Sequence, residues 1–340
     1  MTDHTECEWL DELRTILDQI DLLDSAPLSV TPLLGGVSSD IFLVTAGSRK
    51  LCAKRALPKL KVAADWRVSV DRARYEAAWL QFAAGVCQSC APTVLAFDEA
   101  NGITVLEYLP PDQYALWKDE LLAGRVDVDL ARRVGQRLGA IHQASAGSQA
   151  LAQQFDTAEF FDDIRLSPYL RASADKHPDL AARLNTVADA TKQCKIALTH
   201  GDVSPKNILF NRSTGEPVFL DAECAWFGDP AFDGAFCMNH FLLKALHLPA
   251  CAPQLLDALW AFHDSWLAAL PDEISADTAS RTGTLLPMLM LARIDGKSPV
   301  EYLSEPVRAA TRTLARELIA SGTSRVQDSA EATLRTSSTL

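Results

Sequence analysis

The chain has 340 residues, a hydrophobic content of 48% and a formal net charge of −12. This length exceeds what one ordinary core needs and favours two compact lobes. The acidic balance argues against nucleic acid and against an anionic membrane surface as partners, because both attract basic faces.

The first part of the chain is predicted to be a helix followed by strands. Leucine and isoleucine recur at helical spacing over residues 8–23, so we assign residues 1–24 to an N-terminal helix. Residues 28–56 then read as three strands. A glycine-rich turn follows the first strand, and a Gly-Ser turn precedes the third.

A further helix and two more strands are predicted next. The helix covers residues 71–84, and the strands at 94–97 and 103–109 are joined by an Asn-Gly turn, which is a strong hairpin signal. Two prolines then end the sheet. We therefore expect residues 25–109 to form an N-lobe with a five-stranded antiparallel sheet and one helix.

The rest of the chain is predicted to be mainly helical, for example over residues 128–145, where apolar residues form one stripe. A short β island interrupts it, with strands at 208–210 and 218–220. We assign residues 110–320 to a C-lobe. Residues 321–340 are rich in Ser, Thr and Ala, which predicts a frayed, flexible tail.

Eight cysteines are scattered along the chain, several of them inside apolar runs, which predicts reduced, buried thiols. Cys87 and Cys90 form a single CxxC. Without a second pair we interpret it as incidental, with metal or redox chemistry as the alternative. The N-terminus has no signal-peptide pattern, and no apolar stretch is long enough to span a bilayer. We therefore expect a cytoplasmic protein with no membrane partner.

The segment from Thr199 to Phe210 carries the sharpest motif. Asp202 and Asn207 stand five positions apart in a polar loop before the β island, and the second strand of the island leads to Asp221. The hairpin can therefore bring these three side chains to one site. Phosphoryl transfer needs such a set: a carboxylate that orients and deprotonates a hydroxyl, and hard oxygen ligands for Mg²⁺.

His200-Gly201-Asp202 with Asn207, followed by Asp221 and Glu223, resembles the aminoglycoside phosphotransferase/choline kinase superfamily. The resemblance implies an α+β, two-lobed protein-kinase-like fold with ATP and Mg²⁺ as cofactors. It implies that Asp202 is the catalytic base and that Asn207 and Asp221 are Mg²⁺ ligands. Glu223 either contacts a second Mg²⁺ or pairs with a basic neighbour. Gly201 in place of Arg, and Asp-Ala-Glu in place of Asp-Phe-Gly, are similar to the small-molecule branch.

The same resemblance assigns nucleotide-binding roles in the N-lobe. Lys54 would reach the α- and β-phosphates, and Glu76 on the next helix would pair with Lys54. Residues 54–58 and 71–76 particularly resemble methylthioribose kinases. Backbone amides and hydroxyls of the glycine turn would hold the phosphates, and the segment after the fifth strand would bind adenine through its backbone. The residues concerned are Gly35, Gly36, Ser38, Ser39, Glu107 and Leu109.

Several other residues keep two interpretations. His200 is predicted to be a structural histidine rather than a base, because the kinase pattern gives proton transfer to the Asp. His142 lies beside an apolar stripe and is expected to be a hydrogen-bonded histidine in the core or between the lobes. Lys206 either meets the transferring phosphate or faces solvent. Four more side chains either face the substrate or serve the fold: Trp226, Phe227, Arg293 and Asp295.

The sequence thus predicts a kinase that transfers the ATP γ-phosphate to a hydroxyl of a sugar, an amino alcohol or an aminoglycoside-like molecule, acting as a monomer or homodimer. Similarity to methylthioribose kinases favours a sugar, and an acidic cleft would suit a cationic acceptor. The alternative is a catalytically silent nucleotide-binding protein, against which the intact catalytic set argues. A protein kinase is disfavoured, since Ala-Pro-Glu and a long activation segment are missing.

Overall fold

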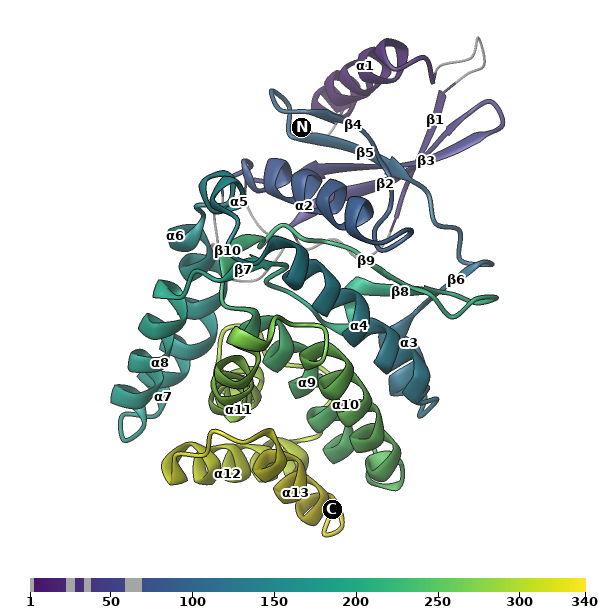
Figure 1. The fold of residues 1–340 in the computed structure, drawn as a ribbon. Helices are drawn as coiled ribbons and strands as arrows, with labels where there is room; N and C mark the ends of the chain where they lie inside the picture. Colours follow the sequence, from purple (N-terminus) through teal and green to yellow (C-terminus); the bar gives the residue numbers. More distant parts are fainter. Residues whose placement is uncertain (1–2, 23–27, 34–37, 59–68) are drawn as a thin grey trace. The chain divides into compact units, whose positions relative to one another are not determined.

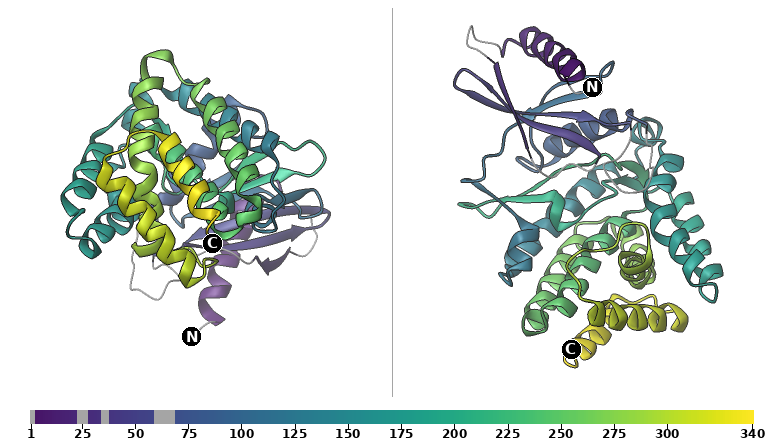
Figure 2. Two further views of the ribbon diagram at one scale, coloured as in Figure 1. Left: turned by 90° about the horizontal axis from the view of Figure 1, so that it is seen from below. Right: turned by 180° about the vertical axis from the view of Figure 1, so that it is seen from behind.

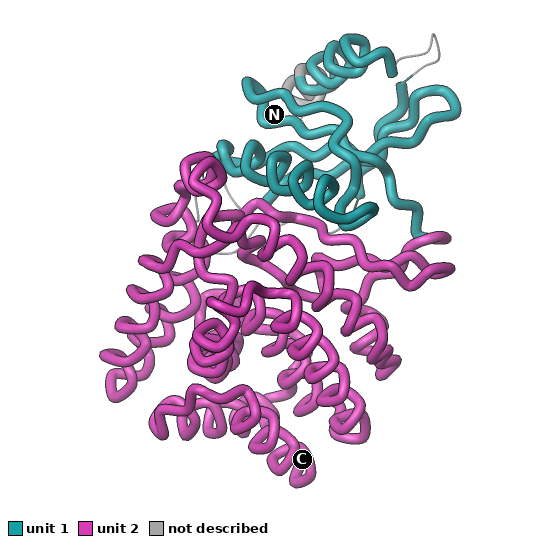
Figure 3. The backbone as a smooth tube through the Cα atoms, in the orientation of Figure 1, with its two compact units in different colours: residues 1–111 teal, residues 112–340 magenta. Residues whose placement is uncertain are grey.

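The computed structural model describes residues 3–22, 28–33, 38–58 and 69–340. The chain divides into two compact units, Met1–Pro111 (unit 1) and Asp112–Leu340 (unit 2) (Figure 3). The lobe boundary predicted from the two prolines, between residues 109 and 110, lies two residues before this division. Figure 1 labels the helices and strands of both units.

Unit 1 contains a five-stranded antiparallel sheet in the order β1-β2-β3-β5-β4, which confirms the predicted sheet. The register places Lys54 of β3 opposite Ile41 of β2 and Thr104 of β5. The strands are β1 Leu28–Pro32, β2 Ser39–Ala46, β3 Arg49–Ala56, β4 Val94–Asp98 and β5 Ile103–Glu107.

Helices α1 (Asp3–Gln19) and α2 (Arg72–Val86) lie on opposite faces of this sheet (Figures 1 and 2). Leu13 and Leu17 of α1 pack with Leu51 and Ala53 of β3 in one core cluster. Side chains alternate along a strand, so Lys54 points to the other face, which α2 covers. The alternation thus separates an apolar layer from a polar one within the same strand.

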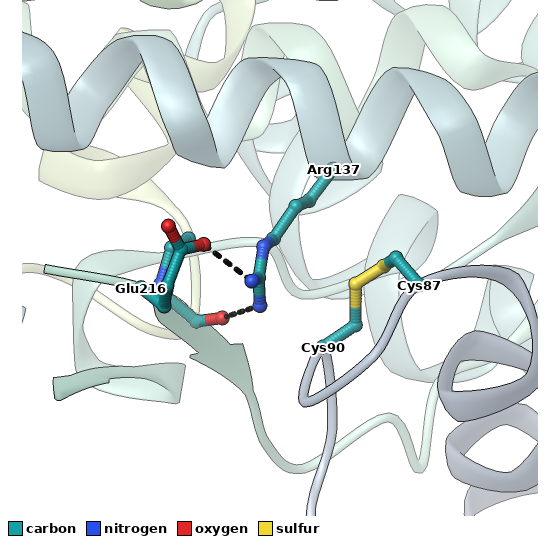
Figure 4. The surroundings of a disulfide bond; sticks show 5 residues. Cys87, Cys90, Arg137 and Glu216 are labelled. Carbon is teal, nitrogen blue, oxygen red and sulfur yellow. Dashed lines mark hydrogen bonds and ion pairs between the residues drawn. A yellow bond between two sulfur atoms is a disulfide. The ribbon is translucent and has the colours of Figure 1, made fainter. Parts of the chain in front are cut away.

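Cys87 and Cys90, directly after α2, are joined by a disulfide with a Cα–Cα distance of 5.5 Å (Figure 4). The prediction of reduced thiols is therefore wrong for this pair. The sequence shows only their three-residue separation, whereas the turn after α2 brings the two Cα atoms to a distance that suits a disulfide. Cys224 and Cys237 are buried free thiols, as predicted.

Unit 2 is mainly helical, with two small sheets that order as β10-β7 and β6-β8-β9. Its centre is α9, in which nearly every residue is buried. Neighbouring helices α10, α11, α12 and α13 contact α9.

The first half of unit 2 comprises β6 Tyr114–Leu116, α3 Trp117–Leu122, α4 Val128–Ser145, α5 Gln149–Gln154, α6 Ala158–Phe161, the π-helix η1 Asp162–Arg171, α7 Ala172–Lys176, α8 Ala181–Gln193 and β7 Ala197–Thr199. The second half comprises η2 Pro205–Asn207, β8 Ile208–Asn211, β9 Pro217–Phe219, β10 Trp226–Gly228, α9 Pro230–His247, η3 Pro249–Cys251, α10 Ala252–Leu267, α11 Asp272–Asp295, α12 Glu305–Ser321 and α13 Val326–Ser337.

The expected flexible tail at 321–340 is wrong, because α13 occupies most of it. Val326 and Ala330 are buried, and α13 contacts α9 and α11. Small side chains let a helix approach its neighbours closely, and Ser and Thr hydroxyls bond back within the helix, as Thr336 does to the Ala332 carbonyl at 2.9 Å. A segment rich in Ser, Thr and Ala can therefore pack as a helix although its composition is typical of a tail.

Among the helices of the described ranges, none has both the length and the hydropathy that a membrane span requires.

Candidate active site

The predicted pair of Lys54 and Glu76 is present in unit 1. The Lys54 ammonium lies 2.7 Å from the Glu76 carboxylate, and the two side chains are only 8% and 4% exposed. Lys54 comes from the middle of the sheet and Glu76 from the first turns of α2. A buried charge is costly unless it is paired. The pair therefore fixes the lysine against α2.

Arg72, four residues before Glu76, is a second buried charge that the sequence interpretation did not assign. Its guanidinium donates to the backbone carbonyls of Ser38 at 2.5 Å, Leu57 at 2.6 Å and Ser69 at 2.7 Å. These carbonyls lie just before β2, just after β3 and just before α2. One side chain thus joins three chain segments around the predicted phosphate-binding turn.

The turn itself is described only from Ser38 onward. Ser38 and Ser39 are 7% and 2% exposed. Gly35 and Gly36 lie outside the described residues. Glu107 ends β5, and its carboxylate accepts from the backbone N–H and the hydroxyl of Thr93, at 3.2 and 3.0 Å.

The Glu107 side chain therefore holds the segment before β4 in place. This leaves only its backbone for the adenine contact that was predicted. Leu109 follows in an irregular, half-buried segment.

In unit 2 the loop with the predicted catalytic motif follows β7, and hydrogen bonds to α9 anchor it. The Asp233 carboxylate accepts the backbone N–H groups of His200 at 2.7 Å and Gly201 at 2.8 Å. It also lies 3.1 Å from Nε2 of His142, whose Nδ1 accepts from Trp266 at 3.0 Å. His142 is thus a fully bonded core histidine, as expected. A buried chain of hydrogen bonds fixes the position of the loop.

The backbone conformation of Gly201 and the hydrogen bonds of His200 also hold this loop in place. Gly201 has φ +77°, and a Cβ at this position would collide with the Cys224 carbonyl oxygen, so only glycine fits. His200 Nε2 lies 2.9 Å from the Leu220 carbonyl, and His200 Nδ1 accepts the Asp202 backbone N–H at 3.2 Å. Burial lowers the His200 pKa. This is the structural histidine that was predicted.

Asp202 is 3% exposed and has two cations beside it. Its Oδ2 lies 2.8 Å from Arg165 Nη2 and 3.1 Å from Lys206 Nζ. Burial raises the pKa of Asp202, but the charges of Lys206 and Arg165 outweigh this effect, so the pKa lies below its usual range. The carboxylate is therefore ionised at neutral pH. Lys206, half exposed, reaches both Asp202 and solvent.

The β8–β9 hairpin brings Asn207 and Asp221 next to Asp202. Asn207 Nδ2 donates to the Asp202 carbonyl at 3.0 Å, and the Leu220 N–H donates to the Asn207 carbonyl at 2.8 Å. Asp221 follows at once, with φ +64°. On the other side, Arg137 of α4 donates to the Pro217 carbonyl at 2.6 Å and also pairs with Glu216 (Figure 4).

The donor chemistry at this hairpin suits Mg²⁺, which prefers carboxylate and amide oxygens. The Asn207 amide donates through nitrogen, which leaves its oxygen as a potential ligand. Asp221 and Glu223 supply carboxylates. No group of three His, Cys, Asp or Glu residues suited to a metal occurs in the described part of the chain. The amide oxygen of Asn207 would therefore have to complete the set.

Arg165 is the residue of this site that sequence reasoning missed. It stands 37 positions before Asp202 in the π-helix η1, and its Nε also donates to the Gly201 carbonyl at 2.8 Å. π-helical turns are rare and frequently occur at functional sites. Neither the motif nor helical periodicity points to Arg165, although Pro168 within the segment does signal an irregular helix.

Three of the four side chains that were expected either to face the substrate or to serve the fold have structural contacts: Trp226, Phe227 and Asp295. Trp226 and Phe227 are buried, and Trp226 stacks on Phe161 with ring centroids 4.2 Å apart, so both belong to the core. Asp295 pairs with His177 at 2.9 Å and with Arg312 at 2.7 Å, which is a structural role.

A sequence profile of the phosphotransferase enzyme family matches residues 29–259. The methylthioribose kinase of Pectobacterium carotovorum subsp. carotovorum is 27% identical over 275 residues, which cover 68% of this chain and 67% of that protein. The methylthioribose kinase of Yersinia pseudotuberculosis is 25% identical over 236 residues, covering 61% of this chain and 56% of that protein. The chain thus spans between about half and two thirds of the length of these relatives.

Solved structures share the fold. The ethanolamine kinase of Plasmodium vivax has a TM-score of 0.56 at 15% identity, covering 88% of this chain and 85% of that one. The choline kinase of Cryptosporidium parvum has a TM-score of 0.53 at 10% identity, covering 93% and 96%. The predicted two-lobed, protein-kinase-like fold is therefore confirmed. Because the family profile matches more than half of the sequence, the chain belongs to the phosphotransferase enzyme family.

Proposed function

We propose that this protein is a Mg-ATP-dependent kinase that phosphorylates a hydroxyl group of a small molecule. The observation that carries the proposal is the gathering of Asp202, Asn207 and Asp221 around one hairpin, with Asp202 ionised beside two cations. Its relatives are kinases of a sugar derivative by name, and its structural neighbours are kinases of amino alcohols by name.

Asp202 is the proposed catalytic base. The acceptor oxygen forms a bond to the γ-phosphorus, the bond from that phosphorus to the bridging oxygen breaks, and ADP leaves with the electron pair while the hydroxyl proton passes to Asp202. Arg165 holds the carboxylate in one orientation from inside unit 2. Lys206 is close enough to Asp202 to interact with the transferring phosphoryl group as well.

Asn207 and Asp221 are the proposed ligands of Mg²⁺, and Glu223 follows Asp221 on the loop between β9 and β10. When bound, Mg²⁺ neutralises negative charge on the phosphate oxygens. The positive φ of Asp221 supports this role, because a non-glycine residue in that conformation is uncommon and such residues cluster at functional sites.

The nucleotide is proposed to bind to unit 1. Lys54, held by Glu76, would contact the α- and β-phosphates, and Ser38 and Ser39 would contribute to the phosphate-binding turn. The other residues proposed for the nucleotide are Gly35, Gly36, Glu107 and Leu109.

Release of ADP from ATP, measured with a panel of sugars, amino alcohols and aminoglycosides, tests this function. Asp202→Asn should lower turnover by about 10²–10⁴-fold and leave ATP binding intact, because it removes only the general base. Asp264→Asn is the matched control, since Asp264 is exposed and pairs with its neighbour His263. A fully active Asp202→Asn protein would remove Asp202 from the mechanism.

A further inference from the structure

Lys244 is a buried lysine that the catalytic set does not use. It lies on α9, is 1% exposed, and its ammonium sits over the Tyr302 ring at 5.2 Å. Over the described residues it has no carboxylate within ion-pair distance. A buried ammonium without a counter-charge is costly, so its presence needs a reason.

The charges nearest to Lys244 are positive and increase this cost. Burial, followed by the charges of Lys118 and Arg293, lowers the pKa of Lys244 to about 7. Burial also lowers the pKa of His240, one turn earlier, and Lys244, Arg293, Lys206 and Lys118 lower it further. Glu301, the acid that acts on Lys244, is itself paired with Lys118.

Polar atoms around Lys244 are buried and unused. His240 Nε2, Arg293 Nε and Tyr302 OH have no hydrogen-bond partner in the described structure. Buried polar atoms are almost always satisfied in native proteins, so each exception indicates a ligand or an ordered solvent molecule. We call His240, Lys244, Arg293 and Tyr302 the basic cluster.

The basic cluster connects directly with the catalytic loop inside unit 2. Arg293 Nη1 donates to the Tyr169 hydroxyl at 3.2 Å, and the Arg165 guanidinium lies over the Tyr169 ring at 5.9 Å. Arg165 in turn contacts Asp202 at 2.8 Å. Tyr169 and Arg165 therefore form a continuous chain of contacts between the cluster and the proposed base within unit 2.

We propose that the acceptor of this kinase carries a carboxylate or a phosphate group, and that the basic cluster binds this group while the acceptor hydroxyl lies beside Asp202. The inference rests on the proposed function. Both anions offer the oxygens that the cluster lacks: acceptors for the Lys244 ammonium, for an N–H at His240 Nε2 and for Arg293 Nε. The charges near Lys244 would repel a cationic group at the basic cluster, so this inference favours an anionic acceptor over the cationic one that the sequence also suggested.

Matched sets of compounds test the charge of the acceptor. One set is glycerol, glycerate and glycerol 3-phosphate, and a second is glucose, gluconate and glucose 6-phosphate, with choline as the cation. The thermal unfolding midpoint and ADP release are measured for each at constant ionic strength. We expect the anionic members to raise Tm above their neutral counterparts, and the two anions distinguish a carboxylate from a phosphate.

Lys244→Met links this response to the basic cluster. Removal of an unpaired buried charge should raise Tm of the empty protein. The anion-induced rise in Tm should disappear, and KM for the anionic acceptor should increase about 30-fold or more, since truncating one partner of a buried charge pair is that costly. A lysine that serves only the fold would give a lower Tm.

Two further variants keep the test specific. His240→Gln should also weaken the anion response and guards against a folding defect of the first variant. Lys192→Met is the matched control: Lys192 pairs with Glu159 at 2.6 Å and Asp162 at 3.0 Å, and its loss should leave the anion response unchanged.

The failure of this inference differs from the failure of the proposed function. If anionic members act no better than neutral ones, or Lys244→Met keeps the anion response, the basic cluster does not bind the acceptor, and ADP release with a neutral compound would still establish the kinase. If the protein neither binds ATP nor releases ADP, the kinase proposal fails. A rise in Tm that depends on Lys244 would then still support the anion site.

Discussion

Two lysines, one in each unit, are buried to a similar degree and differ in what neutralises them. Lys54 lies 2.7 Å from Glu76, so the fold itself provides its counter-charge. Lys244 lies among other cations and over an aromatic ring, without a carboxylate partner in the described chain. A buried charge with a partner is already neutralised by the protein. A buried charge without one is tolerated where a ligand supplies the opposite charge.

The difference teaches how the two kinds of site are built. The ion pair in unit 1 sets the direction of one lysine before any nucleotide arrives. The basic cluster in unit 2 keeps cationic side chains and unpartnered polar atoms for a partner from outside, at the expense of stability. Substitutions that remove one charge should therefore have opposite effects on stability in the two units.

The largest effect is expected from Glu76→Gln. The Lys54 ammonium would lose the buried carboxylate that lies 2.7 Å from it, so the free energy of unfolding should fall by roughly 3–5 kcal/mol. Urea denaturation measures this change. ATP affinity should fall as well, because Lys54 would no longer be held against α2.

The double variant Lys54→Met/Glu76→Leu is the control for this prediction. It removes both charges and should recover most of the lost stability, because apolar side chains of similar size replace a buried pair at little cost. Its affinity for ATP should stay low. If Glu76→Gln were as stable as the unsubstituted protein, the carboxylate of Glu76 would not stabilise the buried Lys54 ammonium.

Lys244→Met should change stability in the opposite direction. Near pH 7 the variant should exceed the unsubstituted protein by roughly 1–4 kcal/mol, the range found when apolar groups replace buried ionic ones. The pKa of Lys244 is about 7 in the fold and 10.5 for an ordinary lysine. Between these values the unfolded state binds the extra proton, so the stability of the unsubstituted protein rises with pH.

The difference between the two proteins should therefore be largest at and below pH 7 and should disappear as the pH approaches the upper value. Urea unfolding of both proteins from pH 6.5 to 9.5 measures it, and parallel curves would contradict an unpaired, depressed Lys244. The charged or titratable groups that act on Lys244, or on which it acts, are Lys118, Cys237, His240, His247, Arg293 and Glu301.

The parts of this molecule that local patterns determine could be predicted. The five-stranded sheet follows from alternating strands with Gly and Asn-Gly turns. The approach of Asn207 and Asp221 to Asp202 follows from one short hairpin. The pair of Lys54 and Glu76 needed only the order of strand and helix, together with the family resemblance.

Residues whose roles depend on distant packing could not be predicted. Arg165 reaches Asp202 from an irregular helix, and no spacing in the sequence relates the two. Lys244 sits in a helix buried on all sides, where hydropathy alone would interpret it as a surface position. Helix α13 is rich in Ser, Thr and Ala, which suggested a tail. Its packing against other helices buries these small side chains, and composition alone does not show this.

A third lysine tests whether burial, and not the presence of a partner alone, sets the size of these effects. Lys192 pairs with two acids, Glu159 and Asp162. Unlike Lys54, its side chain is 23% exposed, and that of Glu159 is 88% exposed. Water screens such contacts, and surface ion pairs contribute about 0–1 kcal/mol. Lys192→Met should therefore lower the free energy of unfolding by less than about 1 kcal/mol, measured by the same urea titration. If Lys192→Met lowered the free energy of unfolding as much as Glu76→Gln does, burial would not set the size of these effects. The presence of acid partners alone would then explain why Lys54 and Lys244 differ.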